Sequence, residues 1–188
     1  MSKAQTETKR SHGFTLIELL ITLTILAIVL TVGIPSMREA FEKRRTVAAV
    51  ERLFSELQTA KIEAIARSQP VFVNIQPGAN WSVGISNNAL CDPSDNNPAC
   101  TLPDMDGNNP ITRIISANEF GTVTLASTGN QITFFPQRGT ATANVFSVTS
   151  TGNQAFAANI IVMPLGQMRI CSQDDNPGSY VTSYRDCG

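Results

Sequence analysis

The stretch KRSHGFTLIELLITLTILAIVLTVGIP, residues 9–35, decides the fold of this chain. A basic cluster and one glycine, Gly13, precede an apolar run in which Glu18 is the only charged residue. About 20 apolar residues are enough to span a bilayer as a helix, and residues 14–34 reach that length. The run therefore predicts a membrane-spanning helix that carries a carboxylate close to its start.

The cost of that carboxylate makes Glu18 the first candidate for a functional residue. An acidic side chain near the centre of a membrane helix costs about 2.5–3.5 kcal/mol on insertion scales, and such residues normally have a partner. An alternative is that Glu18 lies near enough to the interface to reach the headgroups. That alternative explains neither the Gly13–Phe14 junction nor the basic residues before it.

The first 13 residues predict the orientation of the chain. They contain Lys3, Lys9 and Arg10 against Glu7. A secretory signal peptide also begins with positive charge, but this apolar run is about twice a typical signal core, and VGIPSMRE after it offers no small-residue cleavage site. The positive-inside rule keeps residues 1–13 in the cytoplasm. The sequence thus predicts a single-pass membrane protein whose C-terminal part lies on the opposite side of the membrane from the leader.

The helix is predicted to continue beyond the membrane. Gly33 and Pro35 predict a kink in it, because proline removes one backbone donor. After Pro35 the apolar residues recur at the spacing of one helix face: Val47, Val50, Leu53, Phe54, Leu57, Ala60, Ala64 and Ile65. Pro70 ends the helix at Ser68 or Gln69. We expect one helix, membrane-spanning over 14–35 and amphipathic over 36–69.

The rest of the chain, residues 70–188, predicts a β-rich globular domain. Eight short runs are rich in β-branched and aromatic residues and are separated by turn-forming clusters: VFVNI, WSVGI, ITRII, VTLA, ITFF, NVFSVTS, NIIVM and MRIC. TGN at 128–130 and PLGQ at 164–167 are typical of hairpin turns, and residues 87–110 are expected to be the longest irregular segment. The fold class is therefore α+β, with one or two antiparallel sheets packed on the apolar face of the helix.

The cysteine count is even, with Cys91, Cys100, Cys171 and Cys187. Three pairings are formally possible. We predict the local bridges Cys91–Cys100 and Cys171–Cys187, because each pair encloses a loop-like segment that gains order from a covalent link. A metal site is not expected, because Cys-x-x-Cys is absent from the sequence and the one histidine, His12, lies in the basic leader.

Composition argues against catalysis and against broad nucleic-acid binding. The sequence has no phosphate-cradling glycine motif, and DMDGNN at 104–109 does not match the spacing of a calcium loop. We expect neither an enzyme nor a cofactor. Without residues 1–13, the 14 basic and 15 acidic residues of the chain become 11 and 14, a net charge of −3. Such a balance is not typical of a nucleic-acid-binding protein.

The junction G-FTLIELLI, with basic residues before the glycine, resembles the class III signal of type IV pilins and type II secretion pseudopilins. The resemblance implies a pilin-like fold and a prepilin peptidase that cuts between Gly13 and Phe14 and methylates the new amine of Phe14. It also implies that Glu18 pairs with the Phe14 amine of a neighbouring subunit. In a filament core such a pair would favour assembly and help to set the axial register.

Later segments are similar to the FimT, FimU and H-type pseudopilin group of minor subunits: TAKIEAIARSQPVFV, WSVGI, ITFFPQRGTA and PLGQMRIC. The resemblance implies a minor type IV pilin that assembles into or primes a pilus, which serves twitching motility, adhesion or DNA uptake. The implied partners are other minor and major pilins, an inner-membrane assembly platform and the peptidase. A minor pseudopilin of type II secretion is the alternative, and a DNA-binding minor pilin for natural transformation is a second one.

The DNA-binding alternative depends on Arg169. The corresponding family pattern is Gly-Arg-x-Arg, whereas this chain reads Gly166-Gln167-Met168-Arg169, with the first arginine replaced. One guanidinium neutralises at most one phosphate. The favoured interpretation of Arg169 is therefore an exposed strand residue beside Cys171, with DNA contact as the alternative.

Overall fold

The computed structural model describes residues 14–95, 98–104, 109–152, 156–172, 181 and 184–187, without the side chains of 32–36. The leader, including Gly13, lies outside the described residues. The chain divides into two compact units after Arg38. Each unit is considered in turn.

One helix, α1 (Leu16–Arg67), contributes to both units. It starts two residues later than predicted because Thr15 caps it, and it ends at Arg67, directly before the predicted stop. At that end Ser68 has a left-handed backbone, with φ of 54°. The N–H groups of Ser68 and Gln69 donate to the carbonyls of Ile65 and Ala64, at 3.2 and 3.3 Å. These two bonds form a Schellman cap, usually built around glycine.

In the first unit, none of the described apolar side chains of α1 is buried, those of 32–36 not being described. Leu16 is 82% exposed, and exposed leucine, isoleucine and valine side chains continue to Leu30. Among the described residues, no helical stretch is both long enough and apolar enough to cross a membrane. The helical assignment continues through 32–36, and the kink expected at Gly33 and Pro35 stays a prediction.

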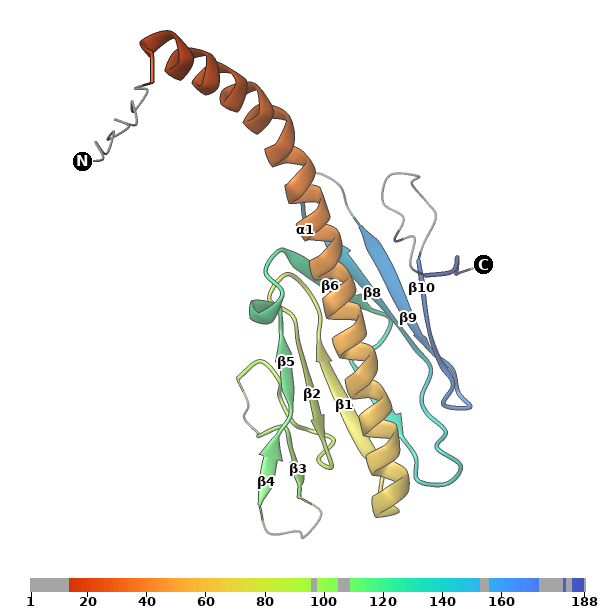
Figure 1. Cartoon of the computed structure of the whole chain (residues 1–188). Helices are drawn as coiled ribbons and strands as arrows, with labels where there is room; N and C mark the ends of the chain where they lie inside the picture. The colour runs from red at the N-terminus through yellow and green to blue at the C-terminus, as the bar shows by residue number, and fades with distance from the viewer. Residues whose placement is uncertain are drawn as a thin grey trace, which may run out of the picture. The chain divides into compact units, whose positions relative to one another are not determined.

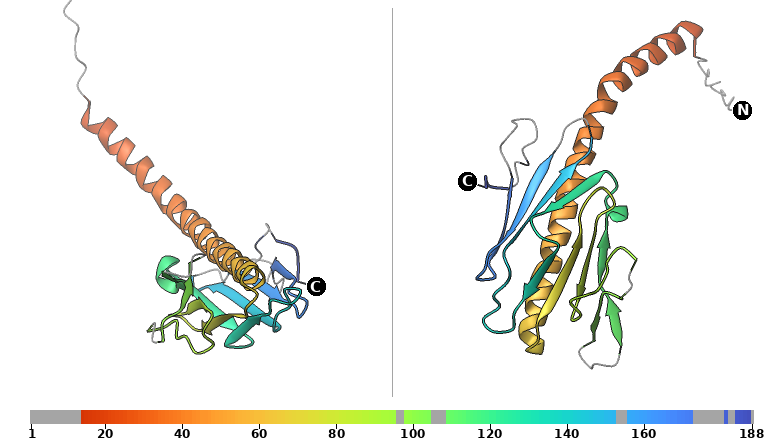
Figure 2. Two further views of the ribbon diagram at one scale, coloured as in Figure 1. Left: turned by 90° about the horizontal axis from the view of Figure 1, so that it is seen from below. Right: turned by 180° about the vertical axis from the view of Figure 1, so that it is seen from behind.

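In the second unit, α1 lies across the strands on one side (Figures 1 and 2) and supplies the centre of the core. The buried face of α1 contains six apolar residues with exposures of at most 1%: Ala49, Val50, Leu53, Leu57, Ala60 and Ala64. The predicted stripe is thus confirmed over most of its length. Ile65 is the exception, because it is 47% exposed at the edge of that face.

Two four-stranded sheets pack on this face, in the orders β5-β2-β1-β7 and β10-β9-β8-β6, and every pair within them is antiparallel. A two-stranded sheet, β3-β4, completes the strands. The bounds are β1 (Val71–Gln76), β2 (Ser82–Ser86), β3 (Thr101–Pro103), β4 (Pro110–Thr112), β5 (Ile114–Ser116), β6 (Val123–Ser127), β7 (Gln131–Phe134), β8 (Asn144–Ser150), β9 (Ala157–Val162) and β10 (Met168–Ser172). A short 3₁₀ turn, η1 (Ala117–Glu119), follows β5.

Each of the eight predicted runs contains strand, but two expectations about them were wrong. The ITRII run splits at Arg113, whose N–H donates to the Cys100 carbonyl and whose carbonyl accepts from Ile85. Before Arg113, β4 pairs with β3, and β3 lies inside the segment 87–110 that was predicted to be irregular. TGN at 128–130 is not a hairpin turn, because β6 pairs with β8 and β7 pairs with β1 in the other sheet. PLGQ at 164–167 does join a hairpin, β9–β10.

Trp81 links the two large sheets. Its side chain is fully buried, its Nε1 donates to the Val123 carbonyl at 2.9 Å, and its ring stacks on Phe120 at 5.8 Å. Val123 opens β6 of one sheet, and Trp81 directly precedes β2 of the other. A buried indole N–H needs such a partner, so the bond fixes the separation of the sheets at this end.

Both predicted disulfides are present. Cys91–Cys100 has a Cα–Cα distance of 5.0 Å, and Cys171–Cys187 one of 4.9 Å. The second bridge holds the C-terminal residues beside β10, where Tyr184 reaches α1 and its hydroxyl donates to a Glu51 oxygen at 3.4 Å. Burial, followed by the nearby Glu51 carboxylate, raises the pKa of Tyr184 to about 12.

A junction of two glycines holds the β9–β10 turn against α1. Gly166 has φ of +70°, and a Cβ added there would lie 1.8 Å from the Gly139 carbonyl oxygen. Lys61 of α1 donates from Nζ to the Gly166 carbonyl at 2.9 Å. The turn therefore needs glycine for both its backbone angle and its close approach.

We expect Gly166→Ala to destabilise the chain well beyond the effect of backbone strain alone. Gly121→Ala is the matched control, because Gly121 has φ of +71° but only the end of the flexible Arg45 side chain nearby, at 3.5 Å. The left-handed backbone should cost about 1–2 kcal/mol in both variants, and the clash with the Gly139 carbonyl adds to it only at Gly166. Thermal unfolding followed by circular dichroism measures the two shifts, and equal shifts would contradict the close approach.

Candidate functional site

The predicted processing junction lies at the start of α1. Phe14 is 79% exposed and precedes the helix, which begins at Leu16. Gly13, on the other side of the scissile bond, is outside the described residues. Cleavage of the bond between Gly13 and Phe14 would leave the whole of α1 intact.

Glu18 has a local partner that was not predicted. The backbone N–H and the hydroxyl of Thr15 both donate to Glu18 Oε2, each at 3.2 Å. The Glu18 N–H donates in return to the Thr15 hydroxyl at 3.3 Å. This reciprocal arrangement is a capping box, which satisfies donors at a helix N-terminus. The signal Thr15-x-x-Glu18 was visible in the sequence.

The capping box uses only one oxygen of the Glu18 carboxylate. Within residues 14–95, where every backbone position is described, Oε1 contacts no hydrogen-bond donor. Glu18 is also the only acidic residue between Phe14 and Arg38. A carboxylate in the first turn is favoured by the helix dipole, so this end of α1 holds one ordered negative charge. Pairing with the Phe14 amine of another subunit stays a prediction.

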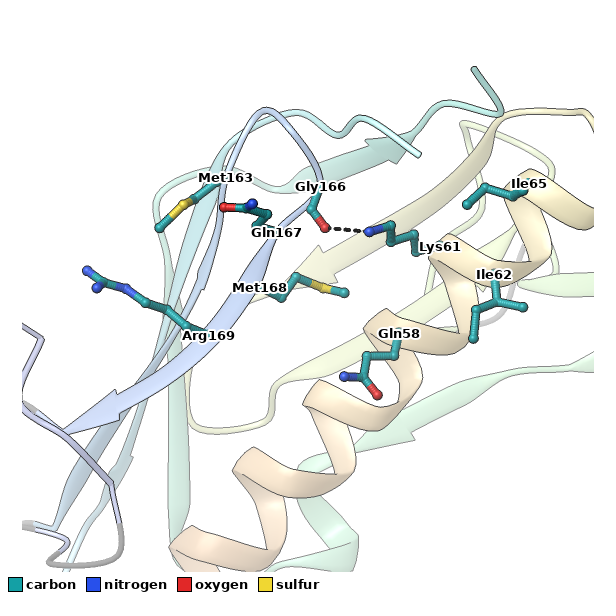
Figure 3. A pocket seen from close by; sticks show the side chains of 9 residues that line it. All are labelled: Gln58, Lys61, Ile62, Ile65, Met163, Gly166, Gln167, Met168 and Arg169. Atoms are coloured by element: carbon teal, nitrogen blue, oxygen red, sulfur yellow. Dashed lines mark hydrogen bonds between the residues drawn. The ribbon is translucent and has the colours of Figure 1, made fainter. Parts of the chain in front are cut away.

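A second candidate site is a groove between α1 and the β9–β10 turn, with a volume of about 590 Å³. Figure 3 shows its two walls, one helical and one formed by the turn and β10. The lining residues are Gln58, Lys61, Ile62, Ile65, Met163, Gly166, Gln167, Met168 and Arg169. The groove therefore combines apolar side chains with two cations and has no carboxylate in its lining.

Arg169 is exposed on β10 and extends away from α1 (Figure 3). Its Nη2 donates to the Cys187 carbonyl at 3.0 Å. Lys61, the other cation of the groove, is bound to the Gly166 carbonyl. Gln167 stands where a second arginine would be needed for the DNA-binding pattern, so the groove offers little basis for a phosphate contact.

In the second unit, the buried carboxylate of Glu56 forms ion pairs with two arginines. Glu56 of α1 lies 3.0 Å from Arg52 and 3.3 Å from Arg113, with its side chain 12% exposed. The pair with Arg113 ties α1 to the residue between β4 and β5. Sequence periodicity could not reveal this link, because Arg113 is 57 residues away. In the described part of the chain, no group of three His, Cys, Asp or Glu side chains could hold a metal ion.

Comparison with solved structures finds the same fold in the P21 crystal form of the Pseudomonas aeruginosa type IV minor pilin FimU. In the P21 form the sequence identity is 17%, the TM-score is 0.50, and the match covers 74% of this chain and 98% of FimU. The P65 form gives a TM-score of 0.46 at the same identity, over 71% of this chain and 98% of that one. Comparison with curated proteins finds no match.

Two family models match this sequence. The prokaryotic N-terminal methylation motif covers residues 8–34, which include the Gly13–Phe14 junction and Glu18. The model of the type II transport protein GspH covers residues 49–166, from the buried face of α1 to the β9–β10 turn. That second match spans more than half of the chain, and the chain belongs to the GspH family of pilin-like and pseudopilin subunits.

Proposed function

We propose that this protein is a minor type IV pilin, a structural subunit that assembles into a pilus or primes its assembly. The observation that carries the proposal is the first half of α1, which is apolar, exposed on all its described positions from Leu16 to Thr31, and charged only at Glu18. A helix that is apolar all round needs a lipid or protein environment. A filament core of packed helices supplies one, and the shared fold with the minor pilin FimU supports this function.

Before assembly the subunit is inferred to sit in the bacterial inner membrane as a single-pass protein, with residues 39–188 in the periplasm. The basic leader supports this orientation. Two disulfides in the second unit support an oxidising compartment, in which such bridges persist. Pilin and pseudopilin families are membrane-anchored as a class, and a prepilin peptidase processes their N-terminal methylation motif.

Glu18 is inferred to join subunits after the leader is removed. Cleavage between Gly13 and Phe14 creates a positive amine at the end of α1. Thr15 holds Oε2 of Glu18 in place, and Oε1 can accept a hydrogen bond from the Phe14 amine of a neighbouring subunit. Pre-ordering of the carboxylate reduces the entropy that pairing would otherwise lose.

A minor pseudopilin of the type II secretion system is the second candidate function. The description of the matched family, a type II transport protein, favours it. Both functions use the same helix and the same junction. Deletion of the gene distinguishes them, because loss of surface pili supports the pilin and loss of protein secretion supports the pseudopilin.

The processing junction gives the first prediction of this function. The mature protein should begin at Phe14 with a methylated amine, and a bulky residue in Gly13→Val should leave the leader attached, whereas Gly13→Ala should be partly processed. Mass spectrometry of the N-terminal peptide from purified protein measures this. A wild-type chain that starts at Met1, or beyond Pro35, would contradict the proposal.

The second prediction separates the charge of Glu18 from its capping role. Glu18→Ala should lower incorporation into sheared filaments by about tenfold or more, because a buried amine left without its partner costs several kcal/mol. Glu18→Gln keeps an acceptor for Thr15 but has no charge, so it should fail equally. Thr15→Ala removes the cap but keeps the charge, and it should assemble with a smaller loss.

Immunoblots of sheared-filament and membrane fractions from the same cells give the ratio for each variant. Membrane levels should stay normal or rise in Glu18→Ala, because the substitution removes a charge from an apolar run. Normal assembly of Glu18→Gln together with failure of Thr15→Ala would show that Glu18 acts only as a helix cap.

A further inference from the structure

The outer edge of β10 is partly open. On its inner side β10 pairs with β9, in the register Met168↔Val162, Ile170↔Ile160 and Ser172↔Ala158. On its outer side a single isolated bridge, Ser172↔Asp186, is present among the described residues. The described C-terminal residues, 184–187, thus cover only one end of this edge.

The hydrogen bonds at Ser172 fix which backbone groups face outward. Its N–H donates to the Arg185 carbonyl at 2.8 Å, and its carbonyl accepts from the Cys187 N–H at 3.2 Å. In an antiparallel pair the outward-facing residues alternate along the strand. The N–H and C=O groups of Met168 and Ile170 therefore also point to the open edge, away from β9. Consistent with this, the carbonyl of Gln167, one position before Met168, accepts from the Met163 N–H on the inner side.

The open edge borders the groove. Met168 is half-buried between the edge and the core, and the facing helical wall carries Ile62 and Ile65, which are 64% and 47% exposed. An extended segment laid beside β10 would pair with its outward-facing backbone groups, and alternate side chains of that segment would face these isoleucines. The same edge already accepts an extended segment at Ser172, from the C-terminal residues of the chain itself.

The charge of the groove restricts the partner. Lys61 and Arg169 are in its lining, and none of the nine lining residues is acidic. Each cation has one backbone carbonyl as a partner in the described structure, and neither has an ion pair there. An incoming carboxylate would therefore neutralise charge without displacing an existing ion pair.

We propose that the β10 edge and its groove bind an extended segment of a neighbouring filament subunit as an added strand. That segment presents an apolar side chain to Ile62 and a carboxylate to Lys61 or Arg169. A nucleic acid is the less suitable ligand, because its phosphates would use neither the isoleucine wall nor the backbone carbonyls of the edge. The inference rests on the proposed function, since the partner is another subunit of the filament.

The test uses the full chain in cells that make filaments, with a photo-reactive phenylalanine analogue at Gln167, an exposed position beside the edge. Irradiated filaments are sheared, and crosslinked peptides are identified by mass spectrometry. We expect the crosslink to join Gln167 to an extended segment of another subunit that contains adjacent apolar and acidic residues.

Two matched substitutions at Met168 test the backbone pairing itself. Met168→Ala removes the side chain and keeps the N–H group, whereas Met168→Pro also removes the N–H group. Because that N–H faces away from β9, proline should be tolerated at this edge position. The crosslink yield should fall at least tenfold for Met168→Pro relative to Met168→Ala.

Ile62→Glu provides a second variant in case Met168→Pro does not fold, as judged by thermal melting and by the Cys171–Cys187 bridge. Ile62 is largely exposed, so its replacement should spare the fold but repel an acidic segment, and it should also lower the yield at least tenfold. Unchanged yields in Ile62→Glu and in any folded Met168→Pro, crosslinks to nucleic acid, or filaments that contain the subunit without a crosslink would each overturn the added strand. Absence of the wild-type subunit from filaments would instead overturn the proposed function and this inference with it.

Discussion

The fold of the second unit depends on one helix face, the stripe of α1 from Ala49 to Ala64. The two four-stranded sheets both pack on it, and Trp81 joins them at one end. Truncation of a fully buried leucine typically costs about 2–5 kcal/mol, and domains of this size are stable by about 5–15 kcal/mol. Leu53 or Leu57 alone therefore accounts for a large fraction of the stability, and three alanines in the stripe, at 49, 60 and 64, let the strands approach the helix closely.

The same helix has a different role in its first half. There the side chains from Leu16 to Leu30 are exposed, and nearly all of them are apolar. What they offer is a surface for lipid or for identical helices. Thr15 satisfies one oxygen of Glu18 within the chain, and the proposed pairing with a Phe14 amine would use the other. A carboxylate that seems costly in an apolar run is thus partly compensated within the subunit itself.

Sequence reasoning succeeded where the determining signals are local. The helix end at Arg67 follows from Pro70, the strand runs follow from β-branched residues between turns, and the disulfides follow from short loops. It failed where the partner is distant in the chain. Tertiary packing fixes three such features: the pairing of β3 with β4, the crossing of residues 128–130 from one sheet to the other, and the Glu56–Arg113 ion pair. The outer edge of β10 could not be predicted for the same reason, since its pairing depends on where the C-terminal residues pack. The capping box at Glu18 is an exception, because its Thr15-x-x-Glu18 signal is local and was still not predicted.

Native-state hydrogen exchange on the full chain tests most directly whether the α1 stripe is the shared core of both sheets. The amides of residues 49–64 should exchange with the same opening free energy as those of β1 and β9, which lie in different sheets. Leu53→Ala should lower all three values by the same amount, about 2–5 kcal/mol, because they open as one cooperative unit. If the helix amides instead opened well below the strand amides, or if Leu53→Ala lowered the helix values alone, the sheets would be stable without α1 and the account would be contradicted.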